Sequence, residues 1–234
     1  MANAEANQMI VSDAIVPQSE LEQVMALDRT SRAVSKQLLE MAGNEAAKAL
    51  IIARSIKQFR SLLTDNVMRD IMELQNNPLG FSTDKTDPGY PIAVVRDCVT
   101  QAFMRGLRVS GNEFNIIAGN LYVTKEGFER LLAEMDGLAN LQIQIGVPSS
   151  DTNGALVPAQ ASWNYCGQAM SMEWQKGVAD YRIPIRVNKA MGIDAIMGKA
   201  KSKVLRHVYA RITGSKLLSE ADFEDVESPE TEVA

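Results

Sequence analysis

Residues 113–124 read EFNIIAGNLYVT, and here the apolar pattern of the chain changes from helical to extended. Two short apolar runs flank Gly119-Asn120, a dipeptide that suits a two-residue hairpin turn. We therefore expect two antiparallel strands joined by a tight turn. The segments on either side of this hairpin decide the fold class.

The chain before the hairpin has the pattern of packed helices. From Leu21 to about Gln75, apolar residues recur roughly every 3.6 positions, which is the spacing of helices that bury one face. Residues 76–90 are dense in Asn, Pro, Gly and Asp, as in an ordered loop. A further helix is predicted after this loop, with Pro91 in its first turn and Gly106 as its C-cap.

The chain after the hairpin combines a helix, several strands and a last helix. A helix is predicted over 125–135, then strand-like segments, with Gln142 and Gln144 on one face of the first, and a final helix over 191–212. We expect an α+β fold: a helical N-terminal part, a small antiparallel sheet with a hairpin, a C-terminal basic helix and an acidic disordered tail. The expected division is a flexible arm (1–20), a single α+β domain (21–216) and the acidic tail (217–234).

Charge is distributed very unevenly along this chain. Its net charge is -5, yet residues 182–216 hold nine Lys or Arg against one acid, Asp194. The last sixteen residues hold seven acids and no base. A concentrated positive segment on an acidic protein favours a polyanionic partner. We expect the tail either to compete for this basic surface or to contact a partner.

The bases of the predicted C-terminal helix divide into two groups. At about 100° per residue, Lys199, Lys203 and Arg206 fall within one narrow arc, which predicts a solvated cationic ridge. Lys201 and Arg211 fall on the apolar side of the helix. Their long side chains would have to extend past the packed surface to bring the charged groups to solvent or to a groove formed with neighbouring elements. A basic face that is solvated and binds nothing is the alternative.

Further candidate contacts flank the ridge. Arg182 and Arg186 have the same strand parity and would face one side, with Lys189 close by in sequence. A basic strand beside the ridge would form a groove suited to a phosphate backbone. Phe128 is expected in the core, and the aromatic residues that could either stack on bases or pack in the core are Tyr122, Trp163, Tyr165, Trp174 and Tyr181.

The motifs of common enzymes and metal sites do not occur. The sequence has no GxxxxGK[ST], HExxH or GxSxG, and one His with two distant Cys cannot supply a metal-ligand cluster. We therefore expect no catalytic residues, no metal and no cofactor. The cysteine usage suits a reducing cytoplasm, and the absence of a long apolar run or a signal peptide predicts no membrane association.

Two blocks of the chain resemble a known family. RDCVTQAFMRGLRV (96–109) followed by NIIAGNLYVTKEGFERLL (115–132) resembles the core of the RecT/Red-beta superfamily of phage single-strand DNA annealing proteins. MGIDAIMGKAKSKVLRHVYARITGSKLLSEADFED (191–225) is similar to that family's basic helix and acidic stretch. By position, the residues that match are Lys199, Lys203 and Arg206 in the helix, and Tyr122, Lys125 and Gly127 in the first block.

The resemblance implies a function that the residues alone do not specify. It implies binding to single-stranded DNA, assembly into rings or helical filaments, and annealing of complementary strands in ATP-independent recombination. The implied partners are single-stranded DNA, the annealed duplex, further copies of the chain, a phage exonuclease and the host single-strand-binding protein, in the cytoplasm of a bacterial host. No enzymatic activity is implied.

Two other functions remain open from the sequence. One is a phage structural or scaffolding protein whose helical N-terminal half drives self-association. The other is an enzyme with a site around His207 and Cys98. For the annealing protein, Lys199→Glu with Lys203→Glu is expected to abolish DNA binding and to leave the fold intact.

Overall fold

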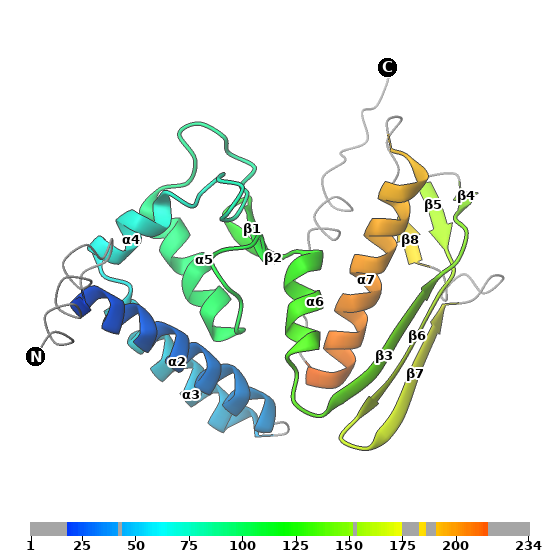
Figure 1. Ribbon diagram of the computed structural model, residues 1–234, viewed down its shortest axis with the longest axis horizontal. Coiled ribbons are helices and arrows are strands. Elements are labelled where there is room, and N and C mark those ends of the chain that lie inside the picture. Colours follow the sequence, from blue (N-terminus) through cyan, green and yellow to red (C-terminus); the bar gives the residue numbers. More distant parts are fainter. Residues whose placement is uncertain (1–17, 42–43, 152–153, 175–182, 186–190, 215–234) are drawn as a thin grey trace, which may run out of the picture.

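The computed structural model describes residues 18–41, 44–151, 154–174, 183–185 and 191–214, and its fold is α+β, as predicted. Figure 1 shows the helical N-terminal part on one side and the larger sheets on the other. Most of the predicted arm lies outside the described residues, but its last positions belong to a helix that starts at Gln18. Within the described ranges, no helix is both long enough and apolar enough to cross a lipid bilayer.

The N-terminal part is built from helices that pack on α5. Phe59 of α3 stacks on Phe103 of α5 with ring centroids 5.8 Å apart, and the Ser31 hydroxyl of α2 donates to the Phe103 carbonyl at 2.7 Å. The C-cap of α5 is Arg105, and Gly106, predicted as the C-cap, is the next residue, with a positive φ of 75°; Pro91 precedes the helix and is its N-cap. The helices are α2 (Gln18–Glu40), α3 (Glu45–Leu62), α4 (Asp65–Met72) and α5 (Ile92–Met104).

The hairpin is present, but its turn lies one residue earlier than predicted. The turn residues are Ala118 and Gly119, with φ of 49° and 75°, while Asn120 already belongs to the second strand. Side chains of the loop before α5 accept hydrogen bonds from the two turn amides. Ala118 N donates to the Asp84 carboxylate at 3.0 Å, and Gly119 N donates to the Tyr90 hydroxyl at 2.9 Å. These contacts, rather than residue preference, place the turn. The two strands are β1 (Phe114–Ile117) and β2 (Asn120–Val123).

Helix α6 (Lys125–Ala133) starts directly after the hairpin and packs closely on it. Thr124 is its N-cap and accepts a hydrogen bond from Gly127 N at 3.2 Å. A Cβ atom at position 127 would lie 2.2 Å from the carbonyl oxygen of Glu113, so only glycine allows this approach. The glycine in the family-like block therefore has a packing role.

Among the described residues, two three-stranded antiparallel sheets follow the hairpin and α6, and helix α7 (Ile193–Thr213) packs on them. The face of β6 toward α7 buries Ala159, Ala161 and Trp163. The opposite face exposes Gln142 and Gln144 of β3, as the alternation predicts. One sheet is ordered β3 (Leu138–Ile145), β6 (Ala159–Tyr165), β7 (Gln168–Trp174); the other is ordered β4 (Ser149–Asp151), β5 (Gly154–Val157), β8 (Ile183–Ile185).

A buried ion pair joins the hairpin to α6 and to the end of α5. Arg130 donates to both carboxylate oxygens of Glu113, one of them at 2.6 Å, and to the Gly106 carbonyl at 2.6 Å. Glu113 also accepts from Arg108 N at 2.8 Å, and Glu134 pairs with Arg130 at 2.7 Å. Burial acts to lower the pKa of Arg130, but the hydrogen bonds and charge of Glu113 outweigh it and raise that pKa.

Glu113→Gln tests this pair. Gln keeps the shape of the side chain but leaves the guanidinium of Arg130 without its buried counter-charge, so we expect a loss of about 3 kcal/mol in the free energy of unfolding. Chemical denaturation measures it. The control is Glu126→Gln at an exposed position of α6, the helix that carries Arg130. It should change the free energy of unfolding by less than about 0.5 kcal/mol. Equal small losses in both variants would show that the buried pair contributes little.

Candidate nucleic-acid interface

Helix α7 carries the densest positive charge among the described residues. It extends over Ile193–Thr213, close to the predicted range, and ends at Gly214 in the left-handed conformation. Its only acid, Asp194, lies in the first turn, where the helix dipole favours a negative charge. Its bases are Lys199, Lys201, Lys203, Arg206 and Arg211.

The prediction that Lys203 belongs to a solvent-exposed cationic ridge is wrong. Lys203 is only 5% exposed, while Lys199 and Arg206, two helical turns apart, are partly exposed. The prediction assumed that one half of the helix packs on the core. Instead, α6 covers one side of α7 and the strands cover another, so little of its circumference is left to solvent. Ile193, at the start of the helix, is an apolar residue that is 65% exposed.

Lys201 and Arg211 have different surroundings. The Lys201 Nζ lies 2.7 Å from a carboxylate oxygen of Glu129 on α6, and both side chains are about two-fifths exposed. This surface pair offsets the Lys201 charge and contributes little to stability. Arg211 is exposed in the last turn of α7. Arg211, unlike Lys201, is therefore an exposed residue.

The candidates from the first family-like block lie on other elements. Tyr122 is buried at 9% exposure in the hairpin, which packs on α5, so its ring is not available for stacking on a base. Lys125 is partly exposed at the first position of α6. Arg182, Arg186 and Lys189 lie outside the described residues, and so does Tyr181.

One aromatic candidate does lie beside the basic helix. The ring of Trp174, at the end of β7, is 5.5 Å from the ring of His207 and is partly exposed. The Arg206 Nη2 lies 3.4 Å from His207 Nε2. We call this group the α7–β7 edge: Lys199, Arg206, His207 and Trp174.

The α7–β7 edge combines cations with an aromatic surface. Such a combination suits a single-stranded nucleic acid, whose phosphates need cations and whose bases stack on rings. The sequence patterns did not assign His207 to this role, because its contact with Trp174 joins a strand and a helix that are distant along the chain. No local pattern carries that information.

The other aromatic candidates are divided between core and surface. Trp163 is 2% exposed and Phe128 is fully buried, its ring edge-on to Tyr209 at 5.8 Å. Both are therefore core residues. Tyr165 is partly exposed, and burial raises its pKa. Tyr165 and Trp174 thus remain the described aromatic candidates with accessible rings.

The cysteine considered for catalysis is chemically unreactive in this setting. Cys98 is buried in α5, and its Sγ donates to the Gly119 carbonyl at 3.6 Å. Burial raises its pKa to about 11, so the thiolate is scarce near neutral pH. His207 lies on α7, not on the helix of Cys98.

Lys203→Glu is expected to destabilise the fold, contrary to the expectation from the sequence. The substitution places an anion in a buried site built around a cation, so we expect a loss of about 3 kcal/mol in the free energy of unfolding. Thermal or chemical denaturation measures it. Arg211→Glu changes the same charge at an exposed position and should cost about 1 kcal/mol or less. A fully stable Lys203→Glu protein would contradict the packed position of this residue.

Comparisons with protein-family models, with curated proteins and with solved structures found no match for this chain. The site consists of a basic helix packed on a sheet, with two partly exposed cations, a histidine and a tryptophan along one edge.

Proposed function

We propose that this chain binds single-stranded DNA along the α7–β7 edge, assembles into homo-oligomers, and anneals complementary strands without ATP. The observation that supports it most directly is the cluster in which Arg206 contacts His207 and the ring of His207 lies against that of Trp174. The proposed self-assembly and strand annealing rest on the resemblance of two sequence blocks to phage annealing proteins. A phage exonuclease and a host single-strand-binding protein are the proposed partners in the cell.

The proposed mechanism is physical rather than chemical. Phosphates bind to the cations of α7, and this binding releases counterions, so it weakens as salt rises. A base stacks on Trp174, whose ring accepts any base because every base has a π face. The remaining bases stay exposed, and pairing with a second strand supplies the free energy of annealing. No nucleotide hydrolysis is needed.

Lys199→Glu with Arg206→Glu tests the DNA interface. Both side chains are partly exposed, and reversing their charge should weaken binding of a labelled oligonucleotide by about tenfold or more. The slope of log affinity against log salt should fall by about 1.4, the value for two lost single-strand phosphate contacts. Fluorescence anisotropy over a salt series measures both quantities.

The matched control is Arg32→Glu with Lys57→Glu, which makes the same charge change at exposed positions of α2 and α3. This protein should bind and anneal as the parent does. Absence of oligonucleotide binding by the parent at low salt would contradict the proposal. If the parent protein failed to bind the oligonucleotide but formed assemblies in electron micrographs, the structural or scaffolding function would be favoured.

Trp174 provides a second, spectroscopic test. The chain has two tryptophans, and the other, Trp163, is buried. Stacking of a base on Trp174 should quench the intrinsic fluorescence when poly(dT) is added, and Trp174→Phe should remove the quench while retaining most of the affinity. Unchanged fluorescence at saturating poly(dT) would show that Trp174 is not at the interface.

A further inference from the structure

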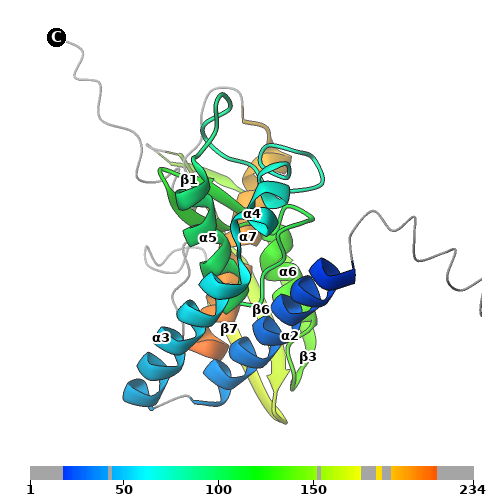
Figure 2. The ribbon, with the colours of Figure 1, turned by 90° about the vertical axis from the view of Figure 1, so that its left-hand side faces the viewer.

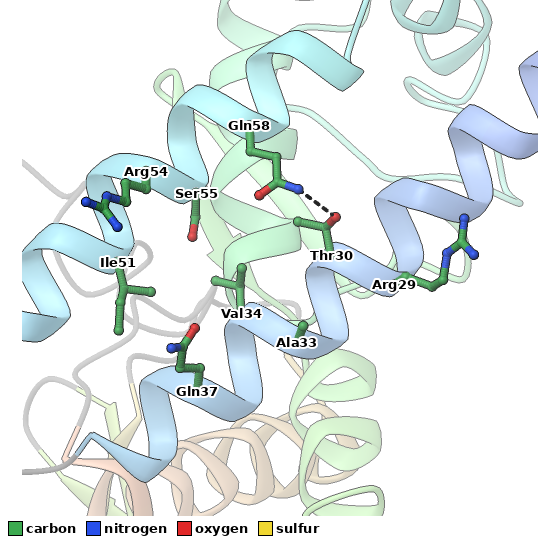
Figure 3. Close-up of a pocket in the computed structure, with 9 residues that line it drawn as sticks. All are labelled: Arg29, Thr30, Ala33, Val34, Gln37, Ile51, Arg54, Ser55 and Gln58. Atoms are coloured by element: carbon green, nitrogen blue, oxygen red, sulfur yellow. Dashed lines mark hydrogen bonds between the residues drawn. The ribbon is translucent and has the colours of Figure 1, made fainter.

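A groove separates the two antiparallel helices α2 and α3 (Figure 3). It has a volume of about 430 Å³, and none of the residues that line it is acidic. Val34 and Ser55 are the buried positions of the lining, and Thr30 and Gln58 are joined by a hydrogen bond of 3.3 Å across the groove. The full lining is Arg29, Thr30, Ala33, Val34, Gln37, Ile51, Arg54, Ser55 and Gln58.

The groove has a positive charge near each end. Arg54 lies near one end and Arg29 near the other (Figure 3). Both side chains are exposed, and neither has an ion pair with any residue in the described part of the chain. Residues 29–63 as a whole contain seven bases and two acids. A ligand of this groove should therefore combine acidic groups with apolar ones.

The acidic tail of the same chain has that composition. Residues 217–232 contain seven acids and no base, interspersed with the apolar Leu217, Leu218, Phe223 and Val226. The tail follows α7, whose C-terminal end lies at the same end of the molecule as the C-terminal end of α2 and the N-terminal end of α3 (Figures 1 and 2). Phe223 follows Gly214 by nine residues, so it can lie up to about 30 Å from the end of α7 when the chain is extended.

We propose that residues 217–232 dock in the α2–α3 groove of their own chain. Their carboxylates pair with Arg29 and Arg54, and Phe223 packs on the apolar side chains of Val34 and Ile51. This inference does not depend on DNA binding, because the groove and the α7–β7 edge belong to different elements. It assigns the tail a binding site away from α7.

Photo-crosslinking of the full-length protein without DNA tests the docking. Phe223 is replaced by p-benzoylphenylalanine, and the crosslinked residues are mapped by mass spectrometry after irradiation. We expect crosslinks to α2 and α3 at the groove. Arg29→Glu with Arg54→Glu should lower their yield roughly tenfold, since two attractions become repulsions. Arg32→Glu with Lys57→Glu, outside the lining, should leave the yield unchanged.

A mixture of ¹⁵N-labelled and unlabelled protein identifies the source of the tail. Crosslinks within a single isotope class support docking on the same chain, and crosslinks between the classes would overturn it in favour of a second copy. Crosslinks to α7 would instead support competition for the basic helix. Crosslinks spread over the surface, or a yield unaffected by Arg29→Glu with Arg54→Glu, would also overturn the proposal. Each outcome is independent of whether the chain binds DNA.

Discussion

The buried pair of Glu113 and Arg130 holds together the junction on which the rest of the structure depends. Arg130 lies on α6, Glu113 immediately precedes the hairpin, and the same guanidinium binds the carbonyl of Gly106 after α5. Burying two charges is costly unless their remaining hydrogen-bonding groups are also satisfied. Here the carboxylate accepts from the backbone of Arg108 as well, so one pair fixes three segments.

The position of α6 determines what α7 can present. Phe128 of α6 packs on Tyr209, and Glu129 pairs with Lys201, so α7 is held against α6 on one side. Strands cover another side. Tyr209 is buried so deeply that burial raises its pKa, although nearby Arg105 acts in the opposite direction. A helix with five bases is therefore a core element, and its basic composition overstates its exposed charge.

The two basic surfaces of the protein differ in the groups that accompany the cations. At the α7–β7 edge, Arg206 contacts His207, whose ring lies against the partly exposed indole of Trp174, and this combination suits phosphates and bases. In the α2–α3 groove, Arg29 and Arg54 flank aliphatic side chains, which suits an acidic peptide. The two surfaces therefore differ in their neighbouring apolar chemistry even where their charge is similar.

The sequence by itself determined the α+β class, the order of the elements and the range of the basic helix, because these depend on local periodicity and turn residues. The tertiary structure decided the hairpin turn, since Asp84 and Tyr90 bind the amides of Ala118 and Gly119 and shift it by one residue. It also decided that Lys203 is buried and that His207 meets Trp174. A helical projection shows which residues share a side of α7, but it cannot show how many sides its neighbours cover.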